Sequence, residues 1–204
     1  MARRAAALEM AILGVICDGP LHGYELRKRL VPVLGLITAI SYGALYPTLK
    51  TMVSRGLLAE QDVTKSEVYP KRNRIVYDIT DTGRARLAEL VADDGTSGAD
   101  DEMFPVRIAM FGQATPETRM RVLQGRRRRL EDRLDLMREN LAKGRERLDA
   151  YTLELQQHGL DALEREVAWL GELIDRERDG EFQPTTPPDL GTLKPRSTRP
   201  KLGP

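Results

Sequence analysis

Apolar residues recur mainly at spacings of three, four or seven between residues 123 and 174, and this spacing confines the second half of the chain to long helices. The pattern is heptad-like with one gap at Gly144, and it predicts a helix over 116–157 that ends at Gly159. A return helix is expected over about 160–178. The apolar seam of the longer helix consists of Leu123, Leu130, Leu134, Met137, Leu141, Leu148, Tyr151 and Leu155.

These two predicted helices differ in length, about 60 Å against about 30 Å at a rise of 1.5 Å per residue. Because the shorter helix cannot cover the whole seam, a second copy of the chain is the expected cover. The alternative is that the seam packs on the first half of the chain. The expected dimerisation residues are Leu123, Leu130, Leu134, Met137, Leu141, Leu163, Val167, Leu170 and Ile174.

The net charge of +1 conceals an uneven distribution of charge along the chain. Residues 1–92 carry a net charge of +4, whereas residues 93–102 hold five acidic residues and no basic one. This Gly/Ser/Asp segment lacks apolar periodicity, which indicates a linker. We therefore expect a first module over 1–92, an acidic linker over 93–102, a helical dimerisation domain over 103–180 and a disordered Pro-rich tail over 181–204.

Several protein classes are excluded or disfavoured by composition. Cys17 is the sole cysteine, which excludes a disulfide scaffold, and His22 and His158 show no metal-ligand spacing. No apolar run approaches the ~20 residues of a membrane span, so we expect a soluble, cytoplasmic protein with no membrane partner. Neither a phosphate-binding loop nor a nucleophile elbow occurs, and we expect no enzyme, cofactor or metal.

The residue pattern of the first module predicts three short helices, then two strands and a fourth helix. Ser41 and Thr80 are suited to cap the third and fourth helices. This order is typical of a winged helix-turn-helix, whose recognition helix enters the DNA major groove, although another small α+β domain could share it. The helices are expected at about 5–17, 22–30, 42–55 and 81–92, and the strands at 57–63 and 74–79.

Candidate DNA-binding residues fall on the third helix and on the tip between the strands. Tyr42 near the helix start is placed to reach base edges, while Tyr46 and Lys50 are placed to meet phosphates; packing of Tyr46 under the wing is the alternative. Tyr24 suits a phosphate contact or the core equally well. The full candidate set is Tyr24, Ser41, Tyr42, Gly43, Tyr46, Lys50, Lys71, Arg72 and Arg74.

Two features of the helical half have a structural and a functional interpretation. The basic run 126–129 spreads around its helix with acidic residues one turn further on, which favours an ion-paired face over a second nucleic-acid surface. Trp169, the single tryptophan, is expected to pack in the seam. The alternative is an aromatic effector pocket that Trp169 forms with Phe104, Met110 and Phe111.

Motifs over about residues 8–90 resemble the PadR family of bacterial transcriptional regulators. The residues that carry this resemblance are a helix over 8–19 that ends in Gly-Pro, LHGYEL at 21–26, ISYGALYPTL at 40–49, RGLL at 55–58 and RIVYDITDTG at 74–83. The family's wing often carries a Gly-Arg-Pro-Arg-like tip, whereas this chain has YPKRNR at 69–74.

The resemblance implies a mainly α fold with a small β-wing, in which an N-terminal winged helix-turn-helix precedes a C-terminal helical hairpin or coiled-coil dimerisation domain. It also implies a sequence-specific transcriptional regulator, expected to be a homodimeric repressor on an inverted-repeat DNA operator. Response to a small-molecule effector is a further implication. The alternative function is a helical protein-interaction adaptor whose winged domain does not read DNA.

Overall fold

Helix α1 (Ala2–Ile16) lies at the centre of the N-terminal half. The structure is a computed structural model that describes residues 2–34, 42–62, 75–93, 100–144 and 147–182. Every residue of α1 from Ala7 to Ile16 is buried, so this helix serves as the core rather than as one side of it. It ends before Gly19, which adopts a φ of +145°, as the sequence predicts.

Helices α2 (Gly23–Leu34) and α3 (Leu45–Ser54) pack against α1. The predicted end of the second helix at residue 30 is wrong, because α2 continues through Pro32. The third helix was expected from residue 42, but a 3-10 turn, η1 (Tyr42–Ala44), precedes α3. Ser41, the predicted cap, lies outside the described residues.

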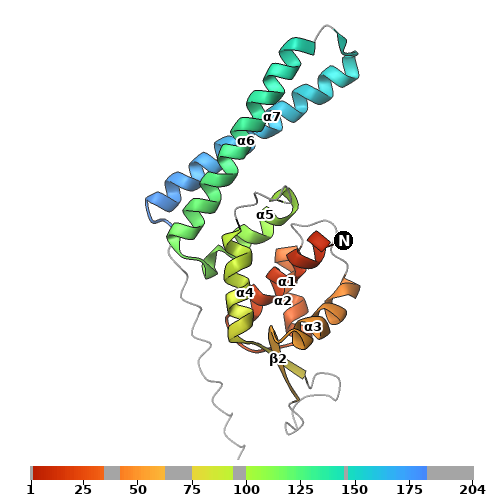
Figure 1. The fold of residues 1–204 in the computed structure, drawn as a ribbon, viewed down its shortest axis with the longest axis vertical. Helices are drawn as coiled ribbons and strands as arrows, with labels where there is room; N and C mark the ends of the chain where they lie inside the picture. The colour runs from red at the N-terminus through yellow and green to blue at the C-terminus, as the bar shows by residue number, and fades with distance from the viewer. Residues whose placement is uncertain (1, 35–41, 63–74, 94–99, 145–146, 183–204) are drawn as a thin grey trace, which may run out of the picture.

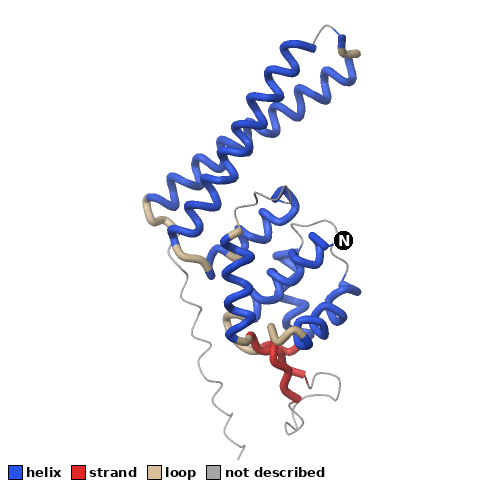
Figure 2. The backbone as a smooth tube through the Cα atoms, viewed as in Figure 1, coloured by secondary structure: helices blue, strands red, loops and turns tan. Residues whose placement is uncertain are grey.

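A three-stranded antiparallel sheet completes the wing in the order β1-β3-β2. The strands are β1 (Leu21–His22), β2 (Leu58–Asp62) and β3 (Ile75–Ile79). β1 was missed because two residues carry no periodicity, and His22, expected at a helix start, pairs with Val76 instead. Figure 2 shows the sheet at the end of the molecule that faces away from the long helices.

Helix α4 (Asp81–Ala92) begins as predicted, with the hydroxyl of Thr80 accepting a hydrogen bond from the amide of Gly83 at 3.0 Å. Helix α5 (Asp100–Ala109) then returns across α1. Its Met103 and Val106 join the core around α1, while Phe104 joins a second core in the long helices. We call α1–α5 with the sheet the head.

The two long helices, α6 (Pro116–Gly144) and α7 (Ala150–Arg178), follow a short 3-10 turn, η2 (Phe111–Gln113), and form an antiparallel hairpin of two equal lengths. The prediction of one helix over 116–157 is therefore wrong. Asp149 caps α7 by accepting hydrogen bonds from the amides of Tyr151 and Thr152, and hydrogen bonding lowers the pKa of its carboxyl.

Gly159 does not end a helix, contrary to the prediction, but lies inside α7 against Met137 of α6. A Cβ at Gly159 would lie 2.9 Å from the Cε of Met137, so the glycine permits close approach of the two helices. A glycine inside a helix costs roughly 1 kcal/mol relative to alanine, so its place here is explained by packing and not by helix propensity.

The predicted dimer seam is largely used within one chain. Six of the expected residues lie in one core that both helices form with Phe104, and Met137 and Val167 are partly buried beside it. These six are Leu123, Leu130, Leu134, Leu163, Leu170 and Ile174. Because α7 is as long as α6, the argument that a short return helix requires a second copy does not hold. Within the described part of the chain, no helix is both long and apolar enough to cross a membrane.

Candidate nucleic-acid interface

Helix α3 presents the face that the sequence predicts. Leu45, Leu49 and Met52 are buried against the head core, whereas Gly43, Tyr46, Pro47 and Lys50 are exposed. The α3 helix and strand β2 lie at the end of the head farthest from the hairpin, so this face is not covered by α6 or α7 (Figure 1).

Tyr46 is both exposed, as DNA contact requires, and in contact with neighbouring elements, as packing under the wing requires. Its side chain is 57% exposed, yet a Cβ on Gly23 at the start of α2 would lie 3.4 Å from its ring. The same Cβ would lie 3.6 Å from Tyr77 of β3, so the three residues meet where α2, α3 and the sheet converge. Burial, with Glu60 and Tyr46 nearby, raises the pKa of Tyr77. Tyr24 is 63% exposed and does not pack in the core.

The remaining candidate DNA-binding residues are four outside the described part of the chain and one at the start of η1. Ser41, Lys71, Arg72 and Arg74 lie outside the described residues. Tyr42 begins η1, but only its backbone is described.

The junction between α3 and the wing is held by a set of contacts that sequence reasoning missed. Gly56 adopts a φ of +71° after α3, and the hydroxyl of Thr80 donates to the carbonyl of Gly56 at 2.6 Å. Glu9 of α1 is buried and forms ion pairs with Arg55, which ends α3, and with Arg86 of α4. The available sequence signal was a single acid in the otherwise apolar run 7–16.

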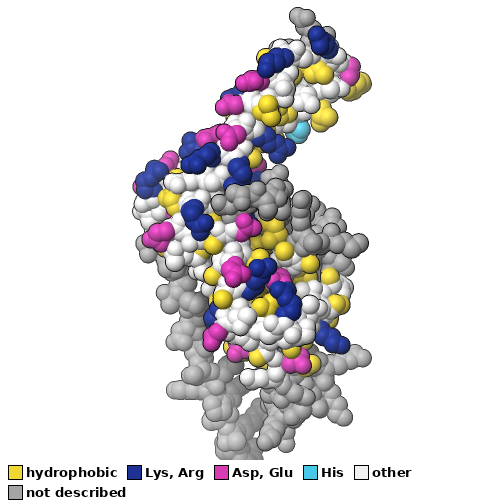
Figure 3. Space-filling model, viewed as in Figure 1, with side chains coloured by type: hydrophobic (Ala, Val, Ile, Leu, Met, Phe, Trp, Pro, Cys, Tyr) yellow, Lys and Arg dark blue, Asp and Glu magenta, His cyan; other side chains and the backbone are white. Residues whose placement is uncertain are grey.

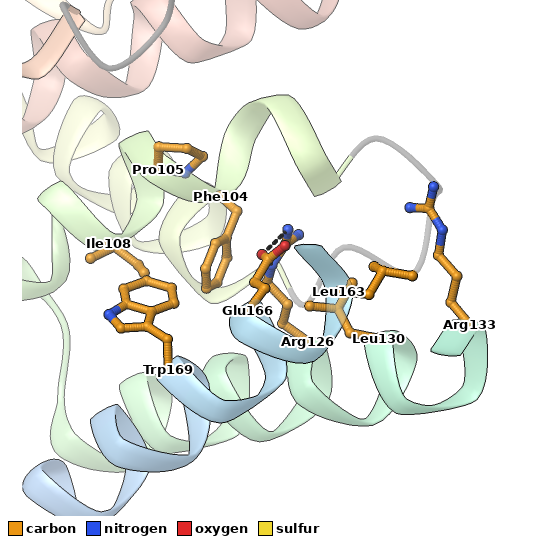
Figure 4. Close-up of a pocket in the computed structure, with 9 residues that line it drawn as sticks. All are labelled: Phe104, Pro105, Ile108, Arg126, Leu130, Arg133, Leu163, Glu166 and Trp169. Atoms are coloured by element: carbon orange, nitrogen blue, oxygen red, sulfur yellow. Dashed lines mark hydrogen bonds and ion pairs between the residues drawn. The ribbon is translucent and has the colours of Figure 1, made fainter. Parts of the chain in front are cut away.

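A cavity of about 620 Å³ lies where α5 meets the hairpin (Figure 4). Phe104 and Trp169 face each other across it edge to face, with ring centroids 6.4 Å apart. The guanidinium of Arg126 lies 4.2 Å from the centroid of Phe104 and donates to Glu166 at 2.9 Å. The other residues that line the cavity are Pro105, Ile108, Leu130, Arg133 and Leu163.

The alternative interpretation of Trp169, an effector pocket shared with Phe104, Met110 and Phe111, is met only in part. Phe104 and Trp169 line the cavity, but Met110 and Phe111 do not. Met110 is buried in the head core against Gly14, and Phe111 packs partly buried against both cores. Helical periodicity could not predict that Met110 and Phe111 lie away from the cavity, because helix α5 ends before them and the chain turns at η2.

The basic run 126–129 is partly ion-paired, as predicted, but its first residue points inward. Arg127 pairs with Glu131 one turn on at 2.8 Å, whereas Arg126 is buried and pairs with Glu166 of α7. Basic and acidic side chains alternate along the visible face of the hairpin (Figure 3). Among the described residues, no group of three or more His, Cys, Asp or Glu side chains is arranged to hold a metal ion.

Two further arginines are buried, one in α5 and one in α6, and no pattern in the sequence indicated their burial. Arg107 of α5 donates to the carbonyl of Leu90 at the end of α4 at 3.3 Å. Arg119 of α6 pairs with Glu177 of α7 at 2.7 Å and donates to the carbonyl of Ala114 at 2.8 Å. A buried charge is invisible to periodicity when its partner lies 58 positions away.

Residues 12–89 match the model of the transcriptional regulator PadR-like family. Over these residues the head is similar to PadR-like regulators. This match covers the last five residues of α1, most of α4 and all of α2, α3 and the sheet, and therefore includes the exposed face of α3. The family that this model describes consists of transcriptional regulators. The hairpin lies outside the matched residues.

Two relatives of known name match the PadR-like part of the chain. A probable transcriptional regulator of Mycobacterium tuberculosis is 31% identical over 87 residues, which are 43% of this chain and 44% of that protein. The negative transcriptional regulator PadR of Bacillus subtilis is 28% identical over 80 residues, or 39% of this chain and 42% of that protein. The aligned part of the chain thus spans less than half the length of either relative.

Solved structures of PadR-like proteins are also similar. Bacillus subtilis PadR in complex with operator DNA is 17% identical, with 83% of this chain and 98% of that chain covered and a TM-score of 0.38. A PadR-like regulator from Bacillus cereus is likewise 17% identical, with 85% of this chain and 99% of that chain covered and a TM-score of 0.38.

Proposed function

We propose that the chain is a sequence-specific DNA-binding repressor that acts as a homodimer. The observation that carries this proposal is the exposed α3 face within the PadR-like domain, where Tyr46 and Lys50 stand beside Gly43. A helix of this kind in a winged helix-turn-helix enters the major groove, and the wing contacts the flanking backbone. Glycine at position 43 leaves room for the backbone to approach a base pair.

A gel-shift salt series with the intergenic duplex upstream of the chain's own coding sequence tests DNA binding. We expect selective binding over a scrambled duplex, with affinity that falls steeply as salt rises. Lys50→Ala should weaken binding across sequences and reduce the salt slope by about 1. Lys143→Ala, which removes an exposed lysine near the far end of the hairpin, is the matched control and should change neither value.

A lack of any selective complex at low salt would favour the other function, a helical adaptor whose winged domain reads no DNA. Loss of binding in Lys143→Ala, with Lys50→Ala unaffected, would place the nucleic-acid surface on the hairpin instead of α3.

The dimer proposal is supported by apolar side chains exposed in the distal half of the hairpin. Leu136 is 59% exposed, Tyr151 is 90% exposed and Leu155 is 67% exposed. Tyr151 and Leu155 lie four residues apart and therefore share one face of α7. A second copy of the chain would remove this surface from water.

Light scattering at micromolar concentration tests the dimer. We expect twice the 22.9 kDa of one chain, and a mass near 22.9 kDa for the triple variant Leu136→Ser, Tyr151→Ser and Leu155→Ser. Since these side chains lie largely outside the hairpin core, the unfolding midpoint of the isolated chain should change little. A wild-type mass near 22.9 kDa would contradict the proposal.

We also propose that the cavity between α5 and the hairpin takes a small aromatic effector. Its volume lies in the range of small-molecule sites, and Phe104 and Trp169 offer an edge and a face to a planar ring. Because Arg126 is already paired with Glu166, a neutral phenol should bind more tightly than benzoate.

Fluorescence of Trp169, the single tryptophan, reports binding directly. Phenol should quench it saturably, and Phe104→Ala should weaken the apparent affinity by roughly three- to tenfold. Quenching with the same midpoint in Phe104→Ala would show that phenol reaches the tryptophan from solvent without entering the cavity.

A further inference from the structure

Glu9 is an unusual residue in the core of the head. It lies in the middle of α1, where its neighbours from Ala7 to Ile16 are buried and almost all apolar, and it is itself only 8% exposed. Both of its carboxylate oxygens are used. Oε1 accepts a hydrogen bond from Nε of Arg86 at 3.0 Å, and Oε2 accepts one from Arg55.

The two arginines come from different elements. Arg55 is the C-cap of α3, where its backbone amide donates to the carbonyl of Thr51 and the amide of Gly56 donates to that of Val53. Gly56 and Leu57 follow directly and turn the chain into β2. Arg86 belongs to α4, and it also pairs with Glu89 at 3.1 Å. Glu9 thus connects α1 and α4 to the point at which the exposed helix becomes the wing.

Stability alone is a poor explanation for a carboxylate at this position. A buried ion pair loses much of its Coulomb energy to desolvation, and apolar residues of similar size often serve as well. Arg55 and Arg86 are exposed at 47% and 36% of their side chains, so without Glu9 both guanidinium groups would simply be solvated. What the carboxylate adds is geometry. Charge-assisted hydrogen bonds are directional, so the bond from Arg86 orients Glu9 and the bond from Arg55 to Glu9 fixes where Arg55 lies.

We propose that Glu9 is a positioning residue for DNA binding: by holding Arg55 against α1 and α4, it sets the angle between α3 and the wing. The proposal rests on the function proposed above. It predicts that loss of the link lowers DNA affinity although neither Glu9 nor Arg55 touches the DNA.

Glu9→Gln and Arg55→Gln break the link from its two sides, and Arg55→Gln leaves Glu9 paired with Arg86. Glu89→Gln is the control, because it removes the other, exposed partner of Arg86 without affecting Arg55. Affinity for the intergenic duplex should fall about tenfold in both link variants, with an unchanged salt slope because no phosphate contact is lost. The control should bind like wild type.

Hydrogen exchange of the free protein gives a measurement that does not depend on DNA. Amides at the junction, from residue 51 to residue 58, should exchange about tenfold faster in both link variants, while those of α2 keep their wild-type rates. The two proposals can fail separately. If exchange is faster in the link variants but the wild-type chain binds no duplex, the repressor is refuted and the positioning of α3 by Glu9 is retained.

Wild-type affinity in both link variants would overturn the positioning role and leave the repressor intact. A gain in affinity in Glu9→Gln would also overturn it, because Glu9 would then be withholding Arg55 from the phosphates. A reduced salt slope in Arg55→Gln would show that Arg55 contacts DNA directly. Uniformly faster exchange in every helix would reduce Glu9 to a general stabilising residue.

Discussion

Arg119→Leu is expected to lower the free energy of unfolding by about 3–5 kcal/mol. The substitution leaves the carboxylate of Glu177 buried without the guanidinium that faces it at 2.7 Å, with both side chains under 10% exposed. It also removes the donor to the carbonyl of Ala114, which lies in the segment that joins η2 to α6. Urea unfolding followed by circular dichroism measures the loss.

The double variant Arg119→Leu with Glu177→Leu separates the cost of an unpaired charge from the value of the pair. Replacing both partners with apolar residues removes the buried charge, so this variant should be clearly more stable than Arg119→Leu alone. Equal losses in the single and double variants would mean that the hydrogen bonds to the backbone carbonyls, and not the ion pair, carry the stability.

Gly83→Ala is the second substitution with a large expected effect, a loss of about 3 kcal/mol in the free energy of unfolding. Gly83 lies in the first turn of α4, and a Cβ there would lie 2.1 Å from the carbonyl oxygen of Leu57 and 2.9 Å from Ile79. The oxygen belongs to the backbone and accepts the amide of Thr80, so it cannot yield without loss of that bond.

Gly112→Ala serves as the control for Gly83→Ala. No atom lies within 4 Å of a Cβ at Gly112, and its backbone does not have a positive φ, so the free energy of unfolding should stay within about 0.5 kcal/mol. A loss in Gly83→Ala no larger than in the control would mean that α4 shifts away from the wing at little cost.

Local patterns predicted the head well. Thr80 caps α4 where expected, and α3 buries Leu45 and Leu49 while it exposes Tyr46 and Lys50, because caps and helical faces depend on residues a few positions apart. The strand β1 was missed since its two residues extend only by pairing with β3, which is more than fifty positions away.

The hairpin turn was misplaced for a different reason. Apolar spacing of three and four continues on both sides of the turn, so it indicates a helix but not where the chain reverses. The heptad pattern predicts Gly144 to be a gap in the seam, whereas it ends α6, and Asp149 caps the next helix. Glu9, Arg119 and Arg126 were missed as buried charges because their partners are 40 or more positions away.

Helix α5 shares its residues between two cores, with Val106 packed around α1 and Phe104 packed in the hairpin. The hairpin is therefore packed against the head through α5, so that a rotation at α5 would move the whole hairpin. Each hairpin helix of 29 residues is about 43 Å long, so a rotation of the hairpin by roughly 10° at α5 displaces its far end by about 7 Å. In a dimer joined at the far ends, the same rotation would change the separation of the two α3 helices by a comparable distance. A major groove is about 12 Å wide, so this change is a large fraction of its width.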